Sequence, residues 1–293
     1  MSTIRVAVPR KGRPLEAVLD RVAARTGATQ LADEVASTLR YEKAVTKGTQ
    51  TTKRDVYERL AEYSDPTDAS SPEYTLLRDS RAGMPRRIVF DSLTVDIGSH
   101  ELQLIGREEP FRALRKHEFA LGFDSADLVL EEVVSLAPEP LSSLDELNER
   151  IDPRDSDVRV VGGLGDTVYH TLLATPDVTD DPTRSFVGGY EGQLCISPRY
   201  ERLVEAVLGT GVTEGIEFCY PDSRDGEEEE AAIAAIGLGV YLTVTGSTAR
   251  EHGLHVGDRL FPSETVLLEN AAEKTEETEA VTDALVARAP EVV

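Results

Sequence analysis

The stretch that decides the fold class is Ile4-Arg5-Val6-Ala7-Val8, followed by Pro9-Arg10-Lys11-Gly12-Arg13-Pro14 and then by residues 15–24. The first segment has the composition of a short strand, and the second is a basic turn that contains glycine. The third predicts an amphipathic helix, because apolar residues recur on one helical face. That face consists of Leu15, Val18, Leu19 and Val22. A strand, a loop and a helix in this order form the opening unit of an α/β domain.

The rest of the chain alternates in the same way, which predicts a mostly parallel sheet. We expect strands at 88–90, 102–105, 119–123, 158–161, 193–197, 216–220 and 239–244, and residues 169–175 form a further apolar run. Helices are expected at 55–63, 109–116, 127–134, 142–149, 198–208, 230–236 and 249–253, with one more after residue 272. Residues 27–87 otherwise give little pattern, and residues 222–230 read as an acidic, solvated loop.

The charge of the chain restricts the classes of partner. Its 293 residues include 31 basic and 54 acidic side chains, for a formal net charge of −23. A phosphate backbone or an anionic membrane would repel such a surface, so we expect neither nucleic acid nor membrane as a partner. Because 40% of the residues are hydrophobic, we assign the charge to the surface of folded domains.

The kind of charge also suggests an environment. Only six basic residues are lysines, and aromatic residues make up 5% of the chain. At molar salt the Debye length is about 3 Å, which screens repulsion between surface carboxylates. These features predict a protein of a salt-loving organism, and the alternative is an acidic mesophilic protein with an acidic tail.

Cysteines and hydropathy bear on the compartment. Cys195 and Cys219 have neither metal-ligand spacing nor a disulfide framework, so we expect reduced core residues. Arg5 and Arg10 interrupt any signal-peptide-like apolar stretch. No run approaches the roughly 20 apolar residues of a membrane span. We therefore expect a cytoplasmic protein.

The sharpest local motif is Thr245-Gly246-Ser247-Thr248, between a β-rich run and a short helix. Small residues there let backbone N–H groups point at an oxyanion, and the hydroxyls and the helix N-terminus add to the same cradle. The motif therefore predicts a phosphate-binding turn. The alternative is an ordinary strand-to-helix turn that Ser247 or Thr248 caps.

A second motif, Arg10-Lys11-Gly12-Arg13, places three cations around one glycine at the carboxyl end of the first strand. Open α/β sheets bind ligands at that end of their strands. The motif predicts an anion-binding turn, and the alternative is a solvated basic turn. The glycine-rich segments 162–166 and 188–192 lack dinucleotide-binding spacing, so we interpret them as hinge or cleft loops.

Four segments, in order, resemble one enzyme family, the ATP phosphoribosyltransferases, which catalyse the first step of histidine biosynthesis. They are Val6-Ala7-Val8-Pro9-Arg10-Lys11-Gly12-Arg13, residues 107–128 with Gly122-Phe123-Asp124, residues 230–254 with Thr245-Gly246-Ser247-Thr248, and 259–270. The third is similar to the family's phosphoribosyl-pyrophosphate motif. The first is similar to its first strand and Lys-Gly-Arg turn. Together the four segments cover about half of the chain.

The resemblance implies a glycosyltransferase that moves ribose 5-phosphate from phosphoribosyl pyrophosphate to ATP, with Mg²⁺ neutralising the pyrophosphate. Lys11 and Arg13 would be the catalytic residues, which meet the pyrophosphate or the triphosphate. The substrate-binding residues would be Thr245, Gly246, Ser247, Thr248, Asp127 and Glu230. No metal ligand can be named. The implied partners are the two small-molecule substrates and further copies of the chain, which a regulatory subunit could join.

The family's fold implies an α/β, two-domain architecture like that of periplasmic binding proteins, with a ligand cleft. We expect residues 1–171 and 251–293 to form the first domain and residues 172–250 the second.

Two departures from the family pattern keep a second function open. Gly237 and Tyr241 stand where the family places acidic residues that meet the ribose, although a shifted match would use Glu230. The segment between Arg13 and Arg107 is also longer than the family needs. The alternative function is therefore a catalytically impaired relative that binds a nucleotide or phosphoribosyl pyrophosphate, or regulates another protein. A transferase that acts on another base is a third possibility.

Overall fold

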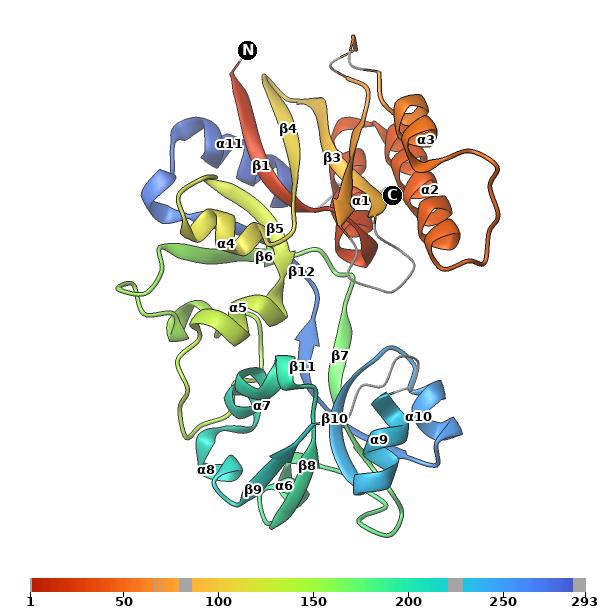
Figure 1. Ribbon diagram of the computed structural model, residues 1–293. Coiled ribbons are helices and arrows are strands. Elements are labelled where there is room, and N and C mark those ends of the chain that lie inside the picture. Colours follow the sequence, from red (N-terminus) through yellow and green to blue (C-terminus); the bar gives the residue numbers. More distant parts are fainter. Residues whose placement is uncertain (1, 66, 69, 79–85, 221–228, 287–293) are drawn as a thin grey trace, which may run out of the picture. The chain divides into compact units, whose positions relative to one another are not determined.

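The chain folds into two α/β units, each with its own sheet (Figure 1). The computed structural model describes all residues except 1, 66, 69, 79–85, 221–228 and 287–293. Unit 1 comprises Met1–Asp124, Asp157–Asp166 and Thr265–Val293, and unit 2 comprises Ser125–Ser156 and Thr167–Glu264. The predicted α/β class is confirmed.

The bounds of the units differ from the predicted domains chiefly at residues 125–156, which belong to unit 2. The reason lies in contacts between segments that are distant in the sequence. The backbone N–H of Leu203 donates to Glu131 over 3.0 Å, and that of Leu141 donates to the carbonyl of Ala206 over 2.9 Å. No pattern of neighbouring residues in the sequence predicts such contacts.

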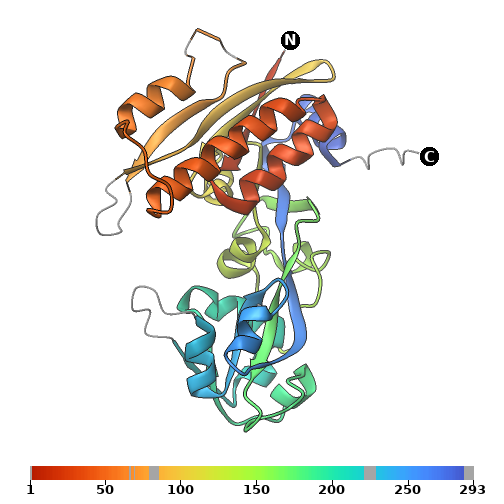
Figure 2. The same cartoon turned by 90° about the vertical axis from the view of Figure 1, so that its right-hand side faces the viewer.

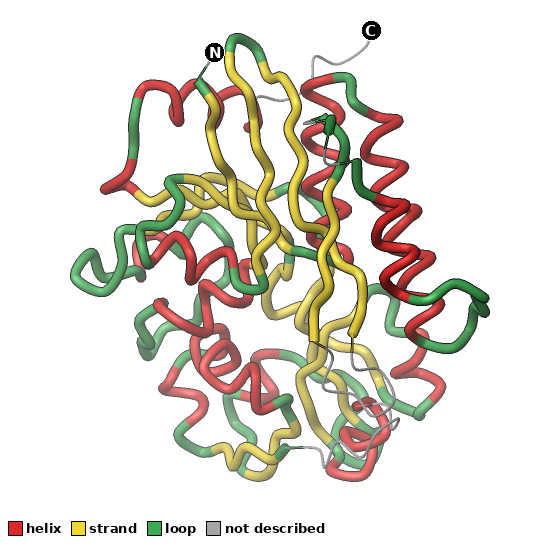
Figure 3. Tube along the Cα trace, turned by 45° about the horizontal axis from the view of Figure 1, so that its top comes forward, coloured by secondary structure: helices red, strands yellow, loops and turns green. Residues whose placement is uncertain are grey.

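The sheet of unit 1 has seven strands in the order β2-β3-β4-β1-β5-β12-β6. These are β1 (Thr3–Pro9), β2 (Glu73–Arg78), β3 (Arg86–Ile97), β4 (His100–Arg107), β5 (Leu121–Ser125), β6 (Val158–Gly163) and β12 (Thr265–Asn270). β1 runs parallel to β4 and β5, whereas the pairs β2–β3, β3–β4 and β12–β6 are antiparallel. The prediction of a mostly parallel sheet is therefore wrong. A tight Gly98-Ser99 turn, with Gly98 at φ +60°, joins β3 to β4 in a hairpin (Figure 3).

Helices α1 (Gly12–Thr26) and α2 (Thr29–Thr46) pack along the sheet of unit 1 (Figure 2). α11 (Glu276–Val286) joins them, and α4 (Pro110–Arg115) also packs against β1. The predicted apolar face of the first helix is confirmed, since all four of its residues are buried in one core with Val6 and Val8. The N-terminal strand and helix therefore form the centre of unit 1.

Helix α2 lies in the segment that gave little sequence pattern, whereas helix α3 (Val56–Tyr63) confirms the helix expected at 55–63. The carboxylate of Glu42, on α2, is 2% exposed and accepts hydrogen bonds from Arg59 over 2.7 and 3.0 Å and from the hydroxyl of Tyr63 over 2.9 Å. Asp55 caps α3 with a reciprocal capping box. A buried ionic contact, in addition to apolar packing, thus fixes these two helices to each other.

The sheet of unit 2 has five strands in the order β11-β7-β10-β8-β9. They are β7 (Val168–Ala174), β8 (Gly192–Cys195), β9 (Ile216–Cys219), β10 (Leu238–Thr243) and β11 (His255–Ser263). The helices of this unit are α5 (Ala126–Val133), α6 (Arg184–Val187), α7 (Glu201–Leu208), α8 (Thr210–Thr213), α9 (Glu229–Ile236) and α10 (Ser247–Glu251). β7 pairs antiparallel with both β10 and β11, whereas β8 pairs parallel with β10 and β9.

Three smaller expectations have outcomes in this part of the chain. A helix at 142–149 is wrong: only a 3-10 turn at Asn148–Arg150 forms, because the buried side chains of Leu141 and Leu147 fix this segment as an irregular loop. Cys195 and Cys219 are unpaired thiols, and burial raises the pKa of Cys195 to about 12. The expected acidic loop at 222–230 lies mostly outside the described residues.

Among the described residues, no helix has the length and the apolar character that crossing a bilayer requires.

Candidate functional site

The basic turn of unit 1 lies at the start of α1 and is held there by hydrogen bonds of Arg10. Gly12 has φ +78°, a backbone angle that other residues adopt at a cost. Arg10 anchors the turn, because its carbonyl accepts from the N–H of Phe90 over 3.1 Å and its Nε donates to the carbonyl of Gly106 over 3.0 Å. Lys11 is the N-cap of α1 and makes no side-chain cap. The first N–H groups of this 15-residue helix therefore have no side-chain acceptor from the cap residue.

The two predicted catalytic cations flank this turn. Lys11 lies 3.4 Å from a carboxylate oxygen of Glu108, and Arg13 lies 3.0 Å from Oδ2 of Asp166. Asp166 is itself fixed, since it accepts from the backbone N–H and the hydroxyl of Thr265 over 2.8 and 2.9 Å. The side chains of Lys11 and Arg13 remain 42% and 39% exposed. Both are thus positioned and accessible to a ligand.

The same turn forms one wall of a cavity of about 560 Å³ within unit 1. Residues of α2 and the first residues of β3 supply other walls. Lys11 and Arg13 therefore line the same cavity. The contribution of α2 could not be predicted, because the sequence gave no helix there.

The predicted phosphate-binding turn of unit 2 connects β10 to α10. Gly246 has φ +69° and is the N-cap of α10, with no side-chain cap. The hydroxyl of Thr245 lies 3.1 Å from that of Ser247, and Arg250 donates to the carbonyl of Thr245 over 2.9 Å. The alternative in which Ser247 or Thr248 caps the helix is therefore wrong. Thr245 and Ser247 are exposed, so their hydroxyls are open to a ligand.

The glycine at position 246 has local reasons that are independent of any ligand. A Cβ atom there would lie 2.8 Å from Cγ2 of Val256. The positive φ also disfavours any residue with a side chain. The backbone conformation and the contact with Val256 therefore already require glycine at position 246. The close approach of its backbone to a phosphate stays a prediction.

Asp127, predicted to bind substrate, is buried near the start of α5 and contacts interior partners. Its Oδ2 accepts from the hydroxyl of Ser263 over 2.8 Å, and its Oδ1 lies 3.2 Å from Nε2 of His170. The His170 ring is 1% exposed and packs edge-on against Tyr200 at 4.8 Å. In this arrangement the carboxylate of Asp127 links α5 to β7 and β11. Sequence reasoning missed His170, which stands in an apolar run with no partner nearby in the sequence.

Glu230, the other predicted substrate-binding carboxylate, lies on α9 and is 9% exposed. It lies near Tyr241 on β10, and burial, together with Glu229 and Glu230, raises the pKa of the Tyr241 phenol to about 12. Glu230 thus places a carboxylate beside Tyr241, which is one of the two residues that stand where the family pattern has an acidic residue. The expected solvated face at residues 227–230 does not extend to this residue.

The other replaced position has a conformational explanation. Gly237 has φ +109°, and a Cβ atom there would lie 2.8 Å from Cγ2 of Val178. Its carbonyl also accepts from the N–H of Thr175 over 2.8 Å. An acidic side chain at position 237 would not fit this backbone.

The predicted residues thus fall into two groups. Lys11 and Arg13 lie in unit 1, and the Thr245–Thr248 turn, Asp127 and Glu230 lie in unit 2. Sequence reasoning missed Asp166, although it had placed this residue in a cleft loop. The sequence feature that could have identified Asp166 is its position directly after the glycine-rich residues 162–165. Among the described residues, no group of three or more His, Cys, Asp or Glu side chains could hold a metal ion.

Three solved structures are similar to the chain. The ATP phosphoribosyl transferase (HisG:HisZ) complex from Thermotoga maritima is 13% identical over 97% of this chain and 94% of that one, with a TM-score of 0.40. The VFT2 domain of BvgS from Bordetella pertussis is 14% identical over 64% and 71%, with a TM-score of 0.32. An ancestral arginine-binding protein bound to glutamine is 10% identical over 63% and 72%, with a TM-score of 0.34.

No curated protein sequence matches the chain at a significant level. A family model described as halobacterial ATP phosphoribosyltransferase, in contrast, matches residues 1–293. This match includes the Lys11–Arg13 turn, the Thr245–Thr248 turn and the long segment that carries α2 and α3. The chain therefore belongs to the halobacterial ATP phosphoribosyltransferase family.

Proposed function

We propose that the protein transfers the 5-phosphoribosyl group of phosphoribosyl pyrophosphate to N1 of ATP, the first step of histidine biosynthesis. In this reaction the N1–C1′ bond forms and the C1′–O bond to pyrophosphate breaks, with its electron pair leaving on the pyrophosphate. The observation that carries the proposal is the family match over the whole chain. The anion-suited geometry of the two turns supports it.

The reaction needs positioning and charge stabilisation more than covalent chemistry from the protein. Lys11 and Arg13 would oppose the charge of the pyrophosphate or triphosphate. Their carboxylate partners Glu108 and Asp166 hold them in place. In unit 2, the exposed hydroxyls of Thr245 and Ser247 would donate to the 5-phosphate, and Glu230 would accept from a ribose hydroxyl. Asp127 would affect substrate binding indirectly, because its contact with His170 helps to position β7.

Mg²⁺ enters this proposal as the counter-ion of the phosphates. Mg²⁺ commonly keeps several waters and binds substrate phosphates. The described residues offer no cluster of three carboxylate, His or Cys ligands, so the phosphates would supply most of the ligands. The partners that we propose are the two substrates and further copies of the chain, which a regulatory subunit could join. A cytoplasmic location and adaptation to molar salt remain predictions.

The second candidate is a relative that binds a nucleotide or phosphoribosyl pyrophosphate without turnover. The observation that favours it is Gly237, whose backbone angle and contact with Val178 leave no room for the acidic side chain of the family. Tyr241, at the other replaced position, offers a neutral phenol in place of a carboxylate.

A product assay separates the two candidates. Purified protein is incubated in molar salt with phosphoribosyl pyrophosphate, ATP and Mg²⁺, beside a known enzyme of the same activity. We expect phosphoribosyl-ATP and pyrophosphate to form in equal amounts. If no product forms while the reference enzyme is active, the transferase proposal is wrong. Calorimetric binding of either substrate would then support the binding-protein alternative, and product with another base would indicate a different acceptor.

A further inference from the structure

The cavity beside the Lys11–Arg13 turn concentrates positive charge in a chain of net charge −23. We call it the α1–α2 pocket. Its lining includes six cationic side chains, which are Lys11, Arg13, Arg40, Lys43, Lys47 and Arg87. Three of these are lysines, of which the whole chain has only six. A pocket with this lining raises the local concentration of anions.

The acidic residues of the lining do not cancel this charge. Among the described residues, only Glu16 and Glu42 contribute carboxylates to the lining. The carboxylate of Glu42 is neutralised by Arg59, which lies outside the lining, and Glu16 pairs with Arg40 at 2.6 Å. Within the part of the chain that the structure describes, Lys43 and Lys47 have no carboxylate partner at ion-pair distance. The ammonium groups of Lys43, on α2, and of Lys47, the C-cap of this helix, are therefore available to a ligand.

Helix electrostatics explains only one side of the pocket. Lys43 and Lys47 lie at the C-terminal end of α2, where cations are favourable for the helix itself. Lys11 and Arg13 lie at the N-terminal end of α1, which has no acidic residue in its first turn. Cations are unfavourable at that end of a helix. Glu108 and Asp166 pair with Lys11 and Arg13, and an anion bound between the two helix ends would add to this compensation.

The size of the pocket and its apolar lining indicate what kind of anion fits. A volume of about 560 Å³ lies in the range of about 300–1,000 Å³ that is typical of small-molecule sites. Leu39, Ile88 and Val89 also line the pocket and offer apolar surface beside the cations. This combination suits a phosphate chain that carries a flat organic group.

We propose that the α1–α2 pocket binds the triphosphate chain of a nucleotide, and that Lys43 of α2 and the C-cap residue Lys47 are phosphate-binding residues. This inference deepens the proposed function, in which ATP is the acceptor. Binding at the pocket nevertheless does not depend on turnover. The segment that carries α2 lies outside the residues on which the sequence resemblance rested, so the inference depends on the structure.

Calorimetry with inorganic tripolyphosphate tests the proposal on the full chain. We expect the double variant Lys43→Gln/Lys47→Gln to bind tripolyphosphate at least tenfold more weakly than the wild type. Lys53→Gln/Lys116→Gln removes the same charge from lysines outside the pocket and should leave the affinity unchanged. The variant Lys43→Arg/Lys47→Arg should restore most of the binding. Thermal unfolding of each variant checks that the fold is kept.

The proposal would be overturned if tripolyphosphate did not bind the wild type, or if both glutamine variants weakened binding equally. ATP and AMP titrations identify the source of the phosphates, because the pocket variant should weaken ATP and leave AMP unaffected. If the product assay fails while tripolyphosphate binding depends on Lys43 and Lys47, the pocket stands without the transferase. If product forms with an unchanged KM for ATP in the pocket variant, the transferase stands and the triphosphate binds elsewhere.

Discussion

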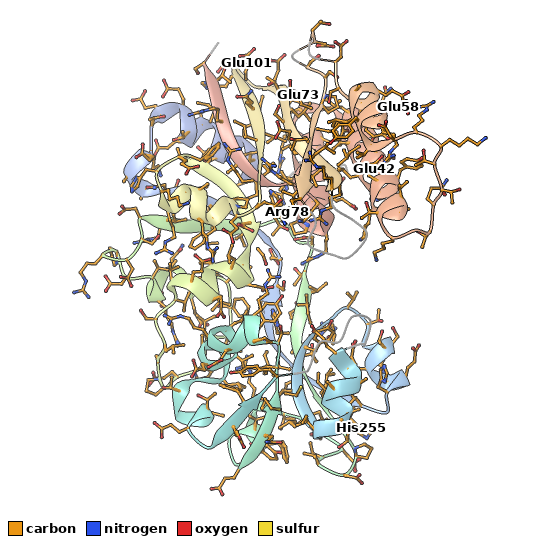
Figure 4. The ribbon with its side chains drawn as sticks, in the orientation of Figure 1. Glu42, Glu58, Glu73, Arg78, Glu101 and His255 are labelled. Carbon is orange, nitrogen blue, oxygen red and sulfur yellow. The ribbon has the colours of Figure 1, made fainter. Side chains whose placement is uncertain are left out.

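The α1–α2 pocket of unit 1 and the Thr245–Thr248 turn of unit 2 are suited to anions by different physical means. The pocket relies on charged side chains that distant segments bring together, and α2 reaches its position through the buried contact of Glu42 with Arg59. The turn relies on backbone geometry and hydroxyls within four consecutive residues. A site like the pocket depends on tertiary structure. A site like the turn depends almost entirely on residues that are adjacent in the sequence. Figure 4 shows Glu42 on α2.

The largest expected effect concerns the contact that holds α2. Arg59→Leu leaves the carboxylate of Glu42 buried without its cationic partner, so the free energy of unfolding should fall by about 3–5 kcal/mol. Tripolyphosphate binding should weaken as well, while binding of ribose 5-phosphate at the turn of unit 2 should persist. Denaturant unfolding and calorimetry measure the two effects.

Arg54→Leu is the matched control for this change. Arg54 pairs with Glu62 on the surface, and such pairs contribute about 0–1 kcal/mol. If both variants lose the same small amount of stability, Glu42 and Arg59 do not fix α2.

The next effect concerns the hydroxyls of the turn. Ser247→Ala should weaken ribose 5-phosphate binding by about 1.5–3 kcal/mol, or roughly ten- to a hundredfold. Because Gly246, and not Ser247, is the N-cap, stability should change by less than about 0.5 kcal/mol. Ser92→Ala, which removes a hydroxyl of unit 1, is the control for both measurements. Unchanged affinity in a folded Ser247→Ala protein would mean that the turn does not use this hydroxyl.

A smaller effect on the free energy of unfolding distinguishes the cost of backbone strain at Gly246 from the cost of crowding its neighbours. Gly246→Ala and Gly253→Ala each place a side chain at positive φ, which costs about 1–2 kcal/mol. Only at position 246 would the new Cβ crowd Val256, since nothing lies within 4 Å of the corresponding position at Gly253. Gly246→Ala should therefore lose more unfolding free energy than Gly253→Ala. Equal losses would show that Val256 moves aside.

The smallest effect is confined to alkaline pH. Burial raises the pKa of Tyr241 to about 12, above the value of about 10 in the unfolded chain. The neutral phenol is thus the form that folding favours, so this stabilisation is complete below pH 10 and is lost as the pH rises to 12. Relative to Tyr241→Phe, the wild type should lose stability between pH 10 and 12. Parallel pH profiles of the two proteins in denaturant unfolding would contradict this assignment.

The parts of the fold that could be predicted have local signals. The apolar face of α1 repeats at helical spacing, and α5, which Ser125 caps, begins close to the helix start expected at residue 127. The Thr245–Thr248 turn was identifiable from small residues between a strand and a helix. Each of these features lies within about 20 consecutive residues.

The parts that could not be predicted depend on distant partners. α2 buries only Ala32, Val35, Ala36 and Glu42, so its apolar stripe is weak and one of its buried residues is charged. The antiparallel β3–β4 hairpin rests on the two-residue Gly98-Ser99 turn, which was missed. His170 and Asp166 acquire their roles through Asp127 and Arg13, which lie far away in the sequence. The cationic lining of the pocket could not be predicted either, because its residues come from segments that are far apart in the sequence.

We propose that the two units carry separate phosphate sites of different physical character. The most direct test is a calorimetric titration of ribose 5-phosphate into protein that is already saturated with tripolyphosphate. We predict that the affinity for ribose 5-phosphate is unchanged by saturation. Lys43→Gln/Lys47→Gln should abolish only the tripolyphosphate site, and Ser247→Ala should weaken only the ribose 5-phosphate site. Competition between the two ligands, or loss of both in either variant, would contradict the claim.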